Sequence, residues 1–208
     1  MKDLPYPMEL TCDPAFKKTV ARLVKRFAIE EIVETGTYLG TGSTLVFAQT
    51  GLPVKSVECD AACVAQARKN LKGYPAVSIL HGYSLKQSEM LTFIMRDSIY
   101  EKNKTLAREG GCYAPLHYLG EISSRRCPQD ILIRLINNKK RQLILLDSSG
   151  GVGYLEFKKV MSIRYLKNKV LMLDDVRHVK HYRSVRELRA RGLRFHSCRS
   201  GRWGWVAF

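Results

Sequence analysis

The sequence predicts an α/β fold in which a mostly parallel sheet is covered by helices on both faces. Strand-like and helix-like segments alternate along most of the chain, as they do in proteins built on parallel sheets. A chain of 208 residues is long enough for one sizeable core. Its 45% hydrophobic and 26% charged residues are ordinary globular values, which exclude a disordered or collagenous protein. We therefore expect residues 1–208 to form a single domain.

The first predicted helix covers residues 14–28. Asp13 can cap the free backbone N–H groups at its start, and Pro14 suits the first helical position. The apolar residues that follow recur with a period of about 3.6, which predicts one apolar face. These residues are Phe16, Val20, Leu23, Val24 and Phe27.

Short β-branched and apolar runs predict the strands. The first of them ends at a glycine-rich turn that leads into a helix, as buried parallel strands do. The predicted strands are residues 30–34, 54–58, 76–80, 142–147 and 169–174. The predicted helices are residues 43–50, 61–71, 85–99, 154–167 and 178–191. At the end of the chain, residues 193–199 and 202–208 flank Ser200-Gly201 and predict an antiparallel hairpin.

An insertion at about residues 100–129 interrupts this alternation. Gly110-Gly111, Pro115 and Pro128 break any helical or strand period, and a short helix near residues 130–138 follows. Long irregular insertions in compact domains commonly serve as lids. We expect this insertion to form a lid or wall over a ligand-binding site.

The composition also bears on the protein's environment. The longest stretch without a charge, residues 35–54, contains four glycines, a proline and five threonines, too few apolar residues for a membrane span. Because the N-terminus has no apolar core of the kind a secretory signal needs, we expect a cytoplasmic protein. The six cysteines are scattered and predict reduced thiols. Cys59 and Cys63 lack the further ligands that a structural zinc site needs.

The main candidate site follows the first strand, in the segment Glu34-Thr-Gly-Thr-Tyr-Leu-Gly-Thr-Gly-Ser43. Open parallel sheets bind ligands beyond the carboxyl ends of their strands, and glycines there let the backbone approach a ligand closely. The glycines are spaced G-x-x-x-G-x-G, which differs from the dinucleotide fingerprint G-x-G-x-x-G, and the Gly-Lys-Ser/Thr ending of a phosphate-binding P-loop is missing.

Two further strand ends lie at the same predicted edge. Glu58 ends the second strand, where its carboxylate can accept both hydroxyl protons of a ribose. Asp60 is expected to cap the following helix. Gly82 and Ser84 follow the third strand and could border an adenine ring, although Ser84 is equally suited to cap a helix.

Taken together and in this order, these motifs resemble the class I S-adenosylmethionine-dependent methyltransferases, and among them the small O-methyltransferases of the catechol O-methyltransferase type. The resemblance covers about residues 30–208 and includes L-L-D-S-S after strand four and L-D-D-V after strand five. It implies a Rossmann-like methyltransferase fold, with seven strands and an antiparallel end. It also implies S-adenosyl-L-methionine as the cofactor. The cofactor-binding residues expected from the resemblance and from the strand ends are Glu34, Gly36, Tyr38, Gly40, Gly42, Ser43, Glu58, Gly82 and Ser84.

Three carboxylates form a second candidate site, because Asp147, Asp174 and Asp175 follow two strands that end at the same edge. Carboxylates that meet without a cation repel one another, and a hard divalent ion such as Mg²⁺ or Ca²⁺ would remove that cost. Metal-dependent O-methyltransferases place their metal ligands at these strand ends, so the three aspartates are expected to bind a metal. The alternative is that Asp174 or Asp175 only caps the next helix.

The general base stays open in the sequence. Catechol-type enzymes have a catalytic lysine three residues after the strand-four aspartate, and that position here is Gly150. Asp147, His178 and His117 are the catalytic candidates, since an imidazole can accept a proton near neutral pH. Asp174, Asp175, His178 and His181 could alternatively form a mixed site for a transition metal.

Basic residues concentrate near the C-terminus. Residues 177–202 contain nine Lys and Arg against Glu187 alone, which is +8 of the chain's net charge of +16. Such a run attracts polyanions, so RNA is a possible partner. The motif typical of amino-group methylation on nucleobases, Asn/Asp-Pro-Pro-aromatic, is missing after strand four. Its absence favours oxygen as the methyl acceptor.

The leading interpretation is therefore an O-methyltransferase that acts on a hydroxylated small molecule, which could carry acidic groups, with help from a divalent metal. An RNA methyltransferase and a non-catalytic S-adenosylmethionine-binding protein are the alternatives. No membrane partner is expected, and a homodimer stays open.

Overall fold

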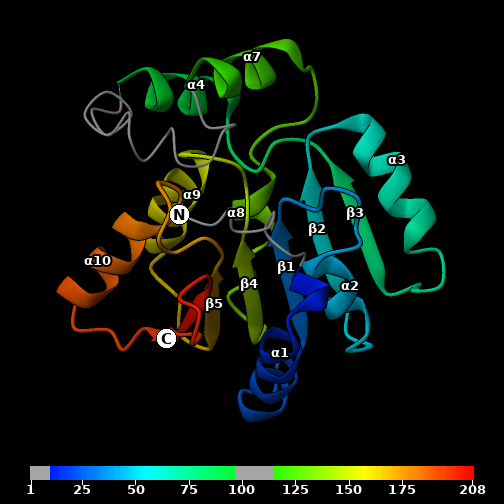
Figure 1. Cartoon of the computed structure of the whole chain (residues 1–208), viewed down its shortest axis with the longest axis vertical. Coiled ribbons are helices and arrows are strands. Elements are labelled where there is room, and N and C mark those ends of the chain that lie inside the picture. The colour runs from blue at the N-terminus through cyan, green and yellow to red at the C-terminus, as the bar shows by residue number, and fades with distance from the viewer. Residues whose placement is uncertain (1–9, 97–114) are drawn as a thin grey trace, which may run out of the picture.

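The computed structural model describes residues 10–96 and 115–208, which form one seven-stranded sheet with helices on both faces (Figure 1). The strand order is β3-β2-β1-β4-β5-β7-β6. The first five strands are parallel, and β7 runs antiparallel to both β5 and β6. The strands are β1 (Glu31–Thr35), β2 (Val54–Glu58), β3 (Val77–His81), β4 (Gln142–Leu146), β5 (Lys169–Leu173), β6 (His196–Ser197) and β7 (Gly204–Ala207). The predicted parallel sheet and closing antiparallel pair are confirmed.

Each helix covers one side or one edge of this sheet. The helices are α1 (Pro14–Arg26), α2 (Ser43–Ala48), α3 (Ala61–Asn70), α4 (Gln87–Arg96), α7 (Pro115–Ser124), α8 (Ile131–Leu135), α9 (Val152–Met161) and α10 (Tyr182–Ala190), with a short 3-10 turn at Leu10–Cys12. Helices α1 and α2 pack on one face of the sheet, and α8, α9 and α10 pack on the other. Helix α3 packs against β2 and β3.

The core is split between the two faces because neighbouring residues of a strand point to opposite sides. Ile32 packs with Phe16 of α1 on one face, and the next residue, Val33, packs with Phe157 of α9 on the other. All five residues of β1, β4 and β5 are buried, as expected for central strands with helices on both sides.

The structure corrects the prediction in three places. The predicted helix 154–167 starts earlier, at Val152, and ends at Met161, seven residues before the left-handed Asn168 turns the chain into β5. The predicted helix 178–191 starts only at Tyr182, because residues 178–181 form turns that bring Lys180 and His181 inward.

The third correction concerns the insertion, of which residues 97–114 lie outside the described part of the chain. Pro115 does not break a helix there; it begins α7, consistent with the preference of proline for the first helical turn. Helices α4 and α7 pack together beyond the carboxyl ends of the parallel strands (Figure 1). Within the described residues, no helix has the length and apolar character needed to cross a membrane.

Candidate active site at the carboxyl edge of the sheet

A crevice of about 560 Å³ lies at the carboxyl ends of the parallel strands. This volume falls within the usual range of small-molecule sites. Five of the nine residues expected to bind the cofactor line it, namely Gly36, Tyr38, Glu58, Gly82 and Ser84. Asp147 and Lys180 also line it, at the side nearer β4. The crevice therefore joins the glycine-rich loop to the acidic cluster.

The glycine loop passes very close to the end of β4. Gly36 has φ of +83°, and an ideal Cβ on it would lie 2.5 Å from the carbonyl oxygen of Asp147. Only glycine combines this conformation with this close approach. Gly40 instead packs against α3, where a Cβ would lie 2.8 Å from Leu71 Cδ1. Neither Gly40 nor Gly42 lines the crevice.

Glu34 has a different position from the one expected. It is fully buried beneath the loop, where its carboxylate accepts hydrogen bonds from the hydroxyls of Ser43, Thr44 (2.6 Å) and Ser56 (2.6 Å). Burial raises the pKa of Glu34, and the three hydroxyl donors act against that shift. Glu34 and Ser43 therefore anchor the loop from below and do not line the crevice.

Glu58 holds the loop from the crevice side. One of its carboxylate oxygens accepts the backbone N–H of Tyr38 at 2.8 Å, and the other accepts that of Asp60 at 2.9 Å. Tyr38 itself is 63% exposed and has φ of +51°. A carboxylate oxygen has more than one acceptor site, so Glu58 can still receive hydroxyl donors from a ligand.

The wall of the crevice on the β3 side comes from α7 and the loop after β3. Tyr83 donates its hydroxyl to the carbonyl oxygen of Ile122 at 2.7 Å, and Arg125 pairs with Asp60 at 2.9 Å. Asp60 also caps α3, as predicted, by accepting the N–H groups of Ala62 and Cys63. The described part of the insertion therefore forms a wall beside Glu58.

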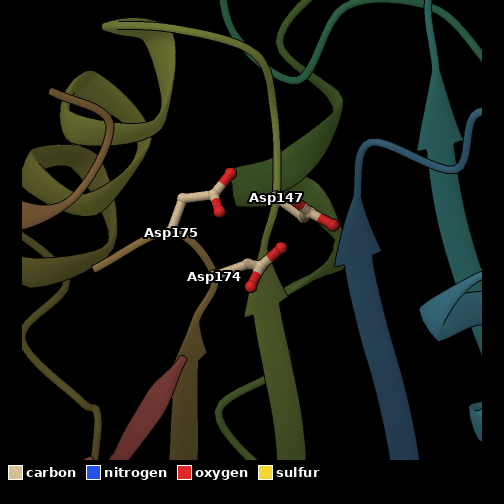
Figure 2. A group of neighbouring side chains, drawn as sticks. All are labelled: Asp147, Asp174 and Asp175. Atoms are coloured by element: carbon tan, nitrogen blue, oxygen red, sulfur yellow. The ribbon is translucent and has the colours of Figure 1, made fainter. Parts of the chain in front are cut away.

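The three aspartates of the second candidate site do meet. Each offers an oxygen within 4.8 Å of the others, where β4 and β5 end (Figure 2). Neither Asp174 nor Asp175 caps a helix with its side chain, since the N-cap residue of α10 is His181. Asp175 has φ of +52°, an uncommon conformation for a residue with a side chain, and such strained positions cluster at functional sites.

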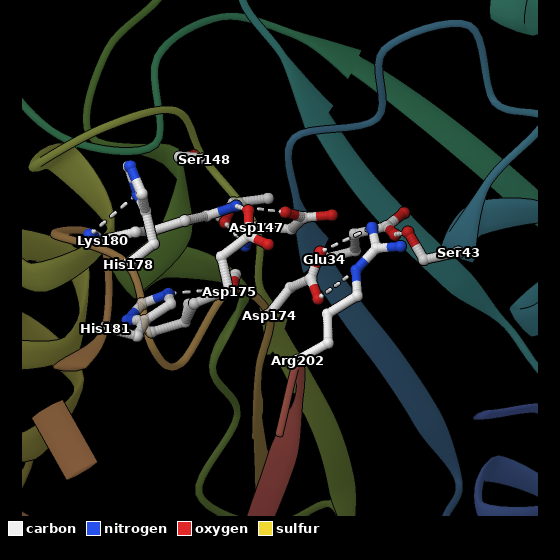
Figure 3. Close-up of polar contacts among 12 residues, drawn as sticks. Glu34, Ser43, Asp147, Ser148, Asp174, Asp175, His178, Lys180, His181 and Arg202 are labelled. Carbon is white, nitrogen blue, oxygen red and sulfur yellow. Dashed lines mark hydrogen bonds and ion pairs between the residues drawn. The ribbon is translucent and has the colours of Figure 1, made fainter. Parts of the chain in front are cut away.

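Two cationic side chains already reach this acidic cluster (Figure 3). Lys180, only 5% exposed, pairs through its ammonium with Asp147 and lies 3.3 Å from Asp175. Arg202 approaches both oxygens of Asp174, at 3.3 and 3.4 Å. Neither residue stands out in the sequence, where both belong to the basic C-terminal run.

The protonation of this cluster reflects burial and charge together. Burial raises the pKa of Asp147 to about 6, although Lys180 acts in the opposite direction. Burial, followed by the neighbouring aspartates, raises the pKa of Asp174 to about 7. Burial alone would lower the pKa of Lys180, but the three carboxylates raise it above its ordinary value. Lys180 is therefore a cation at neutral pH.

The two candidate histidines that the structure describes, His178 and His181, do not form the expected sites. His181 is fully buried, with Nε2 3.1 Å from the carbonyl oxygen of Leu146 and Nδ1 3.1 Å from Ser184 Oγ. Burial lowers its pKa to about 3, so it stays neutral. His178 does not line the crevice, and the side chain of His117 lies outside the described part of the structure. Among the described residues, only the three aspartates form a metal-like cluster, so the mixed oxygen and nitrogen site is wrong.

Glu156 supports the site from outside the crevice, and it is not among the residues predicted from the sequence. It is fully buried in the middle of α9 and accepts hydrogen bonds from the hydroxyls of Thr35 (2.9 Å) and Ser148 (2.6 Å). Thr35 Oγ1 also accepts the N–H of Asp147 at 3.2 Å. Glu156 thus ties the end of β1 to the end of β4. Its signal in the sequence is one acid on the apolar face of a helix.

The nine basic residues of the C-terminal run have three kinds of surroundings. Lys180 and Arg202 belong to the acidic cluster, and Arg183 stacks 4.0 Å above the ring of Tyr154. The other six are exposed, namely Arg177, Arg186, Arg189, Arg191, Arg194 and Arg199. The four cysteines that the structure describes in full, Cys59, Cys63, Cys127 and Cys198, are free thiols.

Comparison with known proteins places this architecture. No protein-family model and no curated protein matches the sequence. Among solved structures, the chain is similar to an O-methyltransferase from Bacillus cereus in complex with SAH, with 17% identity, a TM-score of 0.52, and coverage of 94% of this chain and 82% of that one. The chain has a methyltransferase fold.

Two further methyltransferases agree with this assignment. A precorrin-6y C5,15-methyltransferase from Geobacter metallireducens has 12% identity and a TM-score of 0.53, with coverage of 99% of this chain and 94% of that one. An SAH-bound methyltransferase from Podospora anserina has 13% identity and a TM-score of 0.52, with coverage of 95% and 83%. The predicted Rossmann-like methyltransferase fold is confirmed, and identities this low speak to the fold alone.

Proposed function

We propose that the protein is an S-adenosyl-L-methionine-dependent methyltransferase that methylates a hydroxyl oxygen of a small molecule. The observation that carries this proposal is the single crevice that joins the Gly36 loop and Glu58 to Asp147 and Lys180. Its two ends offer different chemistry. Polar groups that suit a ribose lie at one end, and charged groups that suit an ionising hydroxyl lie at the other.

Several residues of the crevice would hold the cofactor. Gly36 exposes backbone at the end of β1, Glu58 can accept ribose hydroxyls, and Gly82 with Ser84 borders the position expected for the adenine. Bound S-adenosylmethionine would supply a methyl group on a sulfonium sulfur, which could be transferred to an acceptor oxygen with the electrons of the C–S bond left on sulfur.

Of the candidate general bases whose side chains the structure describes, Asp147 is the one that lines the crevice. With a pKa of about 6, its side chain is mostly a carboxylate at neutral pH and can take the proton of the acceptor hydroxyl. Its orientation is set from two sides, because Lys180 binds its carboxylate and Thr35 binds its backbone N–H. Asp147→Asn should therefore abolish methyl transfer while SAH affinity is retained.

The expected divalent metal fits this cluster poorly. The three carboxylates are a suitable oxygen donor set for Mg²⁺ or Ca²⁺. However, Lys180 and Arg202 already pair with all three of them. A metal could bind only if these ion pairs were broken, so no step of the proposed reaction depends on one.

RNA is the second candidate substrate, supported by the six exposed arginines near the C-terminus. An acceptor with acidic groups would use the same positive charge. Loss of catalysis with retained cofactor binding is the non-enzymatic alternative, and the Asp147 variant separates it from an active enzyme.

Calorimetry with SAH tests the cofactor assignment. Glu58→Gln should weaken SAH binding about 10-fold, as expected when a hydrogen bond to a charged group is lost. Glu30→Gln is the matched control, because Glu30 also accepts a backbone N–H, from Arg141 at 2.8 Å, but does not line the crevice. If NAD binds and SAH does not, the proposal is wrong.

A further inference from the structure

We propose that the Lys180 ammonium takes the place of a divalent cation in the Asp147–Asp174–Asp175 cluster and donates a hydrogen bond to the acceptor oxygen. The site would then work without a metal. The second half of this inference rests on the proposed function, whereas the first half concerns the cluster itself and does not.

The first support is the position of the ammonium. Lys180 Nζ binds Asp147, from β4, and lies 3.3 Å from Asp175, which follows β5. It therefore bridges the same two strand ends that a metal would bridge (Figure 3). A divalent ion held by these carboxylates would lie within a few ångströms of a second positive charge. The two cations compete for the same oxygens.

The second support is the way in which the lysine is held. Its side chain is 6% exposed and passes beside the N-terminus of α9, where an ideal Cβ on Gly153 would lie 2.7 Å from Lys180 Cγ. The next residue, His181, is anchored to the carbonyl oxygen of Leu146 at 3.1 Å. With its stem packed and its neighbour anchored, Lys180 cannot leave the cluster without rearrangement of the loop after β5.

The charges of the cluster agree with this arrangement. Arg202 contacts both oxygens of Asp174, and Lys180 contacts Asp147 and Asp175. Three carboxylates thus meet two cationic side chains from the chain itself. The repulsion that would otherwise call for a metal is already largely removed.

The third support concerns the acceptor. An ammonium has three N–H donors, and contacts with Asp147 and Asp175 account for two of them. Within the described residues the third has no protein partner, and Lys180 lines the crevice. A fixed cation beside an acceptor hydroxyl favours its ionised form and stabilises the negative charge that develops on oxygen. Lys180 would hold that oxygen next to Asp147, which takes its proton.

Calorimetry with Mn²⁺ tests the first half. The wild-type protein should not bind Mn²⁺ at this cluster. Lys180→Met removes the ammonium but keeps an unbranched stem, so the carboxylates should then bind Mn²⁺ at least about 10-fold more tightly. Lys180→Arg, which keeps a cation, should resemble wild type. Lys159→Met is the matched control, because Lys159 pairs with Glu89 at 2.9 Å and does not line the crevice.

Absorbance titration with 4-nitrocatechol, in the presence of SAH, tests the second half. This chromophoric phenol should bind wild type as its phenolate and shift its absorption accordingly. Lys180→Met should weaken that binding about 100-fold, the scale of losing one preorganised donor to a developing oxyanion. SAH affinity should change less than about 3-fold, because Lys180 pairs with Asp147 after β4, whereas Glu58 ends β2, on the other side of β1.

The outcomes separate this inference from the proposed function. Mn²⁺ binding to wild type, or 4-nitrocatechol binding that is absent from wild type or equal in Lys180→Met, overturns the corresponding half. If SAH does not bind wild type, the proposed function fails, yet the Mn²⁺ titration still decides whether Lys180 is the cation of the cluster. If Lys180→Met does not fold, as judged by circular dichroism, the wild-type and Lys180→Arg titrations decide the metal question.

Discussion

The close approach of the Gly36 loop to β4 can be tested with one methyl group. In Gly36→Ala, the new Cβ would lie 2.5 Å from the carbonyl oxygen and 2.8 Å from the carbonyl carbon of Asp147. Backbone cannot swing away as a flexible side chain can, so the two strand ends must separate by about 1 Å. The residue must also keep φ near +83°, which a side chain disfavours.

The magnitude follows from these two costs. A left-handed conformation costs a residue with a Cβ about 1–2 kcal/mol, and overpacking costs about 1–3 kcal/mol. Gly36→Ala should therefore lower the free energy of unfolding by about 2–5 kcal/mol. It should also weaken SAH binding, since both Gly36 and Asp147 line the crevice.

Two other glycines separate the contributions in urea denaturation and SAH calorimetry. Gly51 has φ of +75° with no atom within 4 Å of an ideal Cβ, so Gly51→Ala should cost only about 1–2 kcal/mol. Gly73 has open space and an ordinary φ, so Gly73→Ala should change stability by less than about 0.5 kcal/mol. Equal stability of Gly36→Ala and Gly51→Ala would refute the close contact between the loop and β4.

Three further predictions concern the site and its surroundings. Gly153→Ala places a Cβ 2.7 Å from Lys180 Cγ, so it should reduce methyl transfer more than SAH affinity, and equal losses would contradict this. The folded-state pKa of His181 is lowered to about 3, so only the unfolded chain gains this proton below about pH 6.5. Wild type should therefore lose about 2 kcal/mol more unfolding free energy than His181→Gln between about pH 7.5 and 5. Replacement of three exposed arginines by alanine should leave small-molecule methylation nearly unchanged, and a salt-steep RNA affinity lost in that variant would instead favour an RNA substrate. These arginines are Arg186, Arg189 and Arg191.

The sequence by itself determined the architecture and the edge at which the site lies. Alternation of strand and helix patterns, together with the hairpin signal at Ser200-Gly201, predicted the parallel sheet and its antiparallel end. These features are readable because hydrophobic periodicity and turn residues act locally. The convergence of Asp147, Asp174 and Asp175 was also predictable, since parallel strands end at one edge.

The tertiary structure alone decided what surrounds those residues. Glu34 looked like a ligand contact because it lies at a strand end. In the structure it is buried beneath the loop, where its carboxylate accepts hydrogen bonds from three hydroxyls. Lys180 and Arg202 looked like surface charge, because a count of charges does not show which way each side chain points. The left-handed Asp175 and the turns that follow it bring Lys180 to the carboxylates, and such a non-local ion pair depends on loop conformation, which periodicity does not encode.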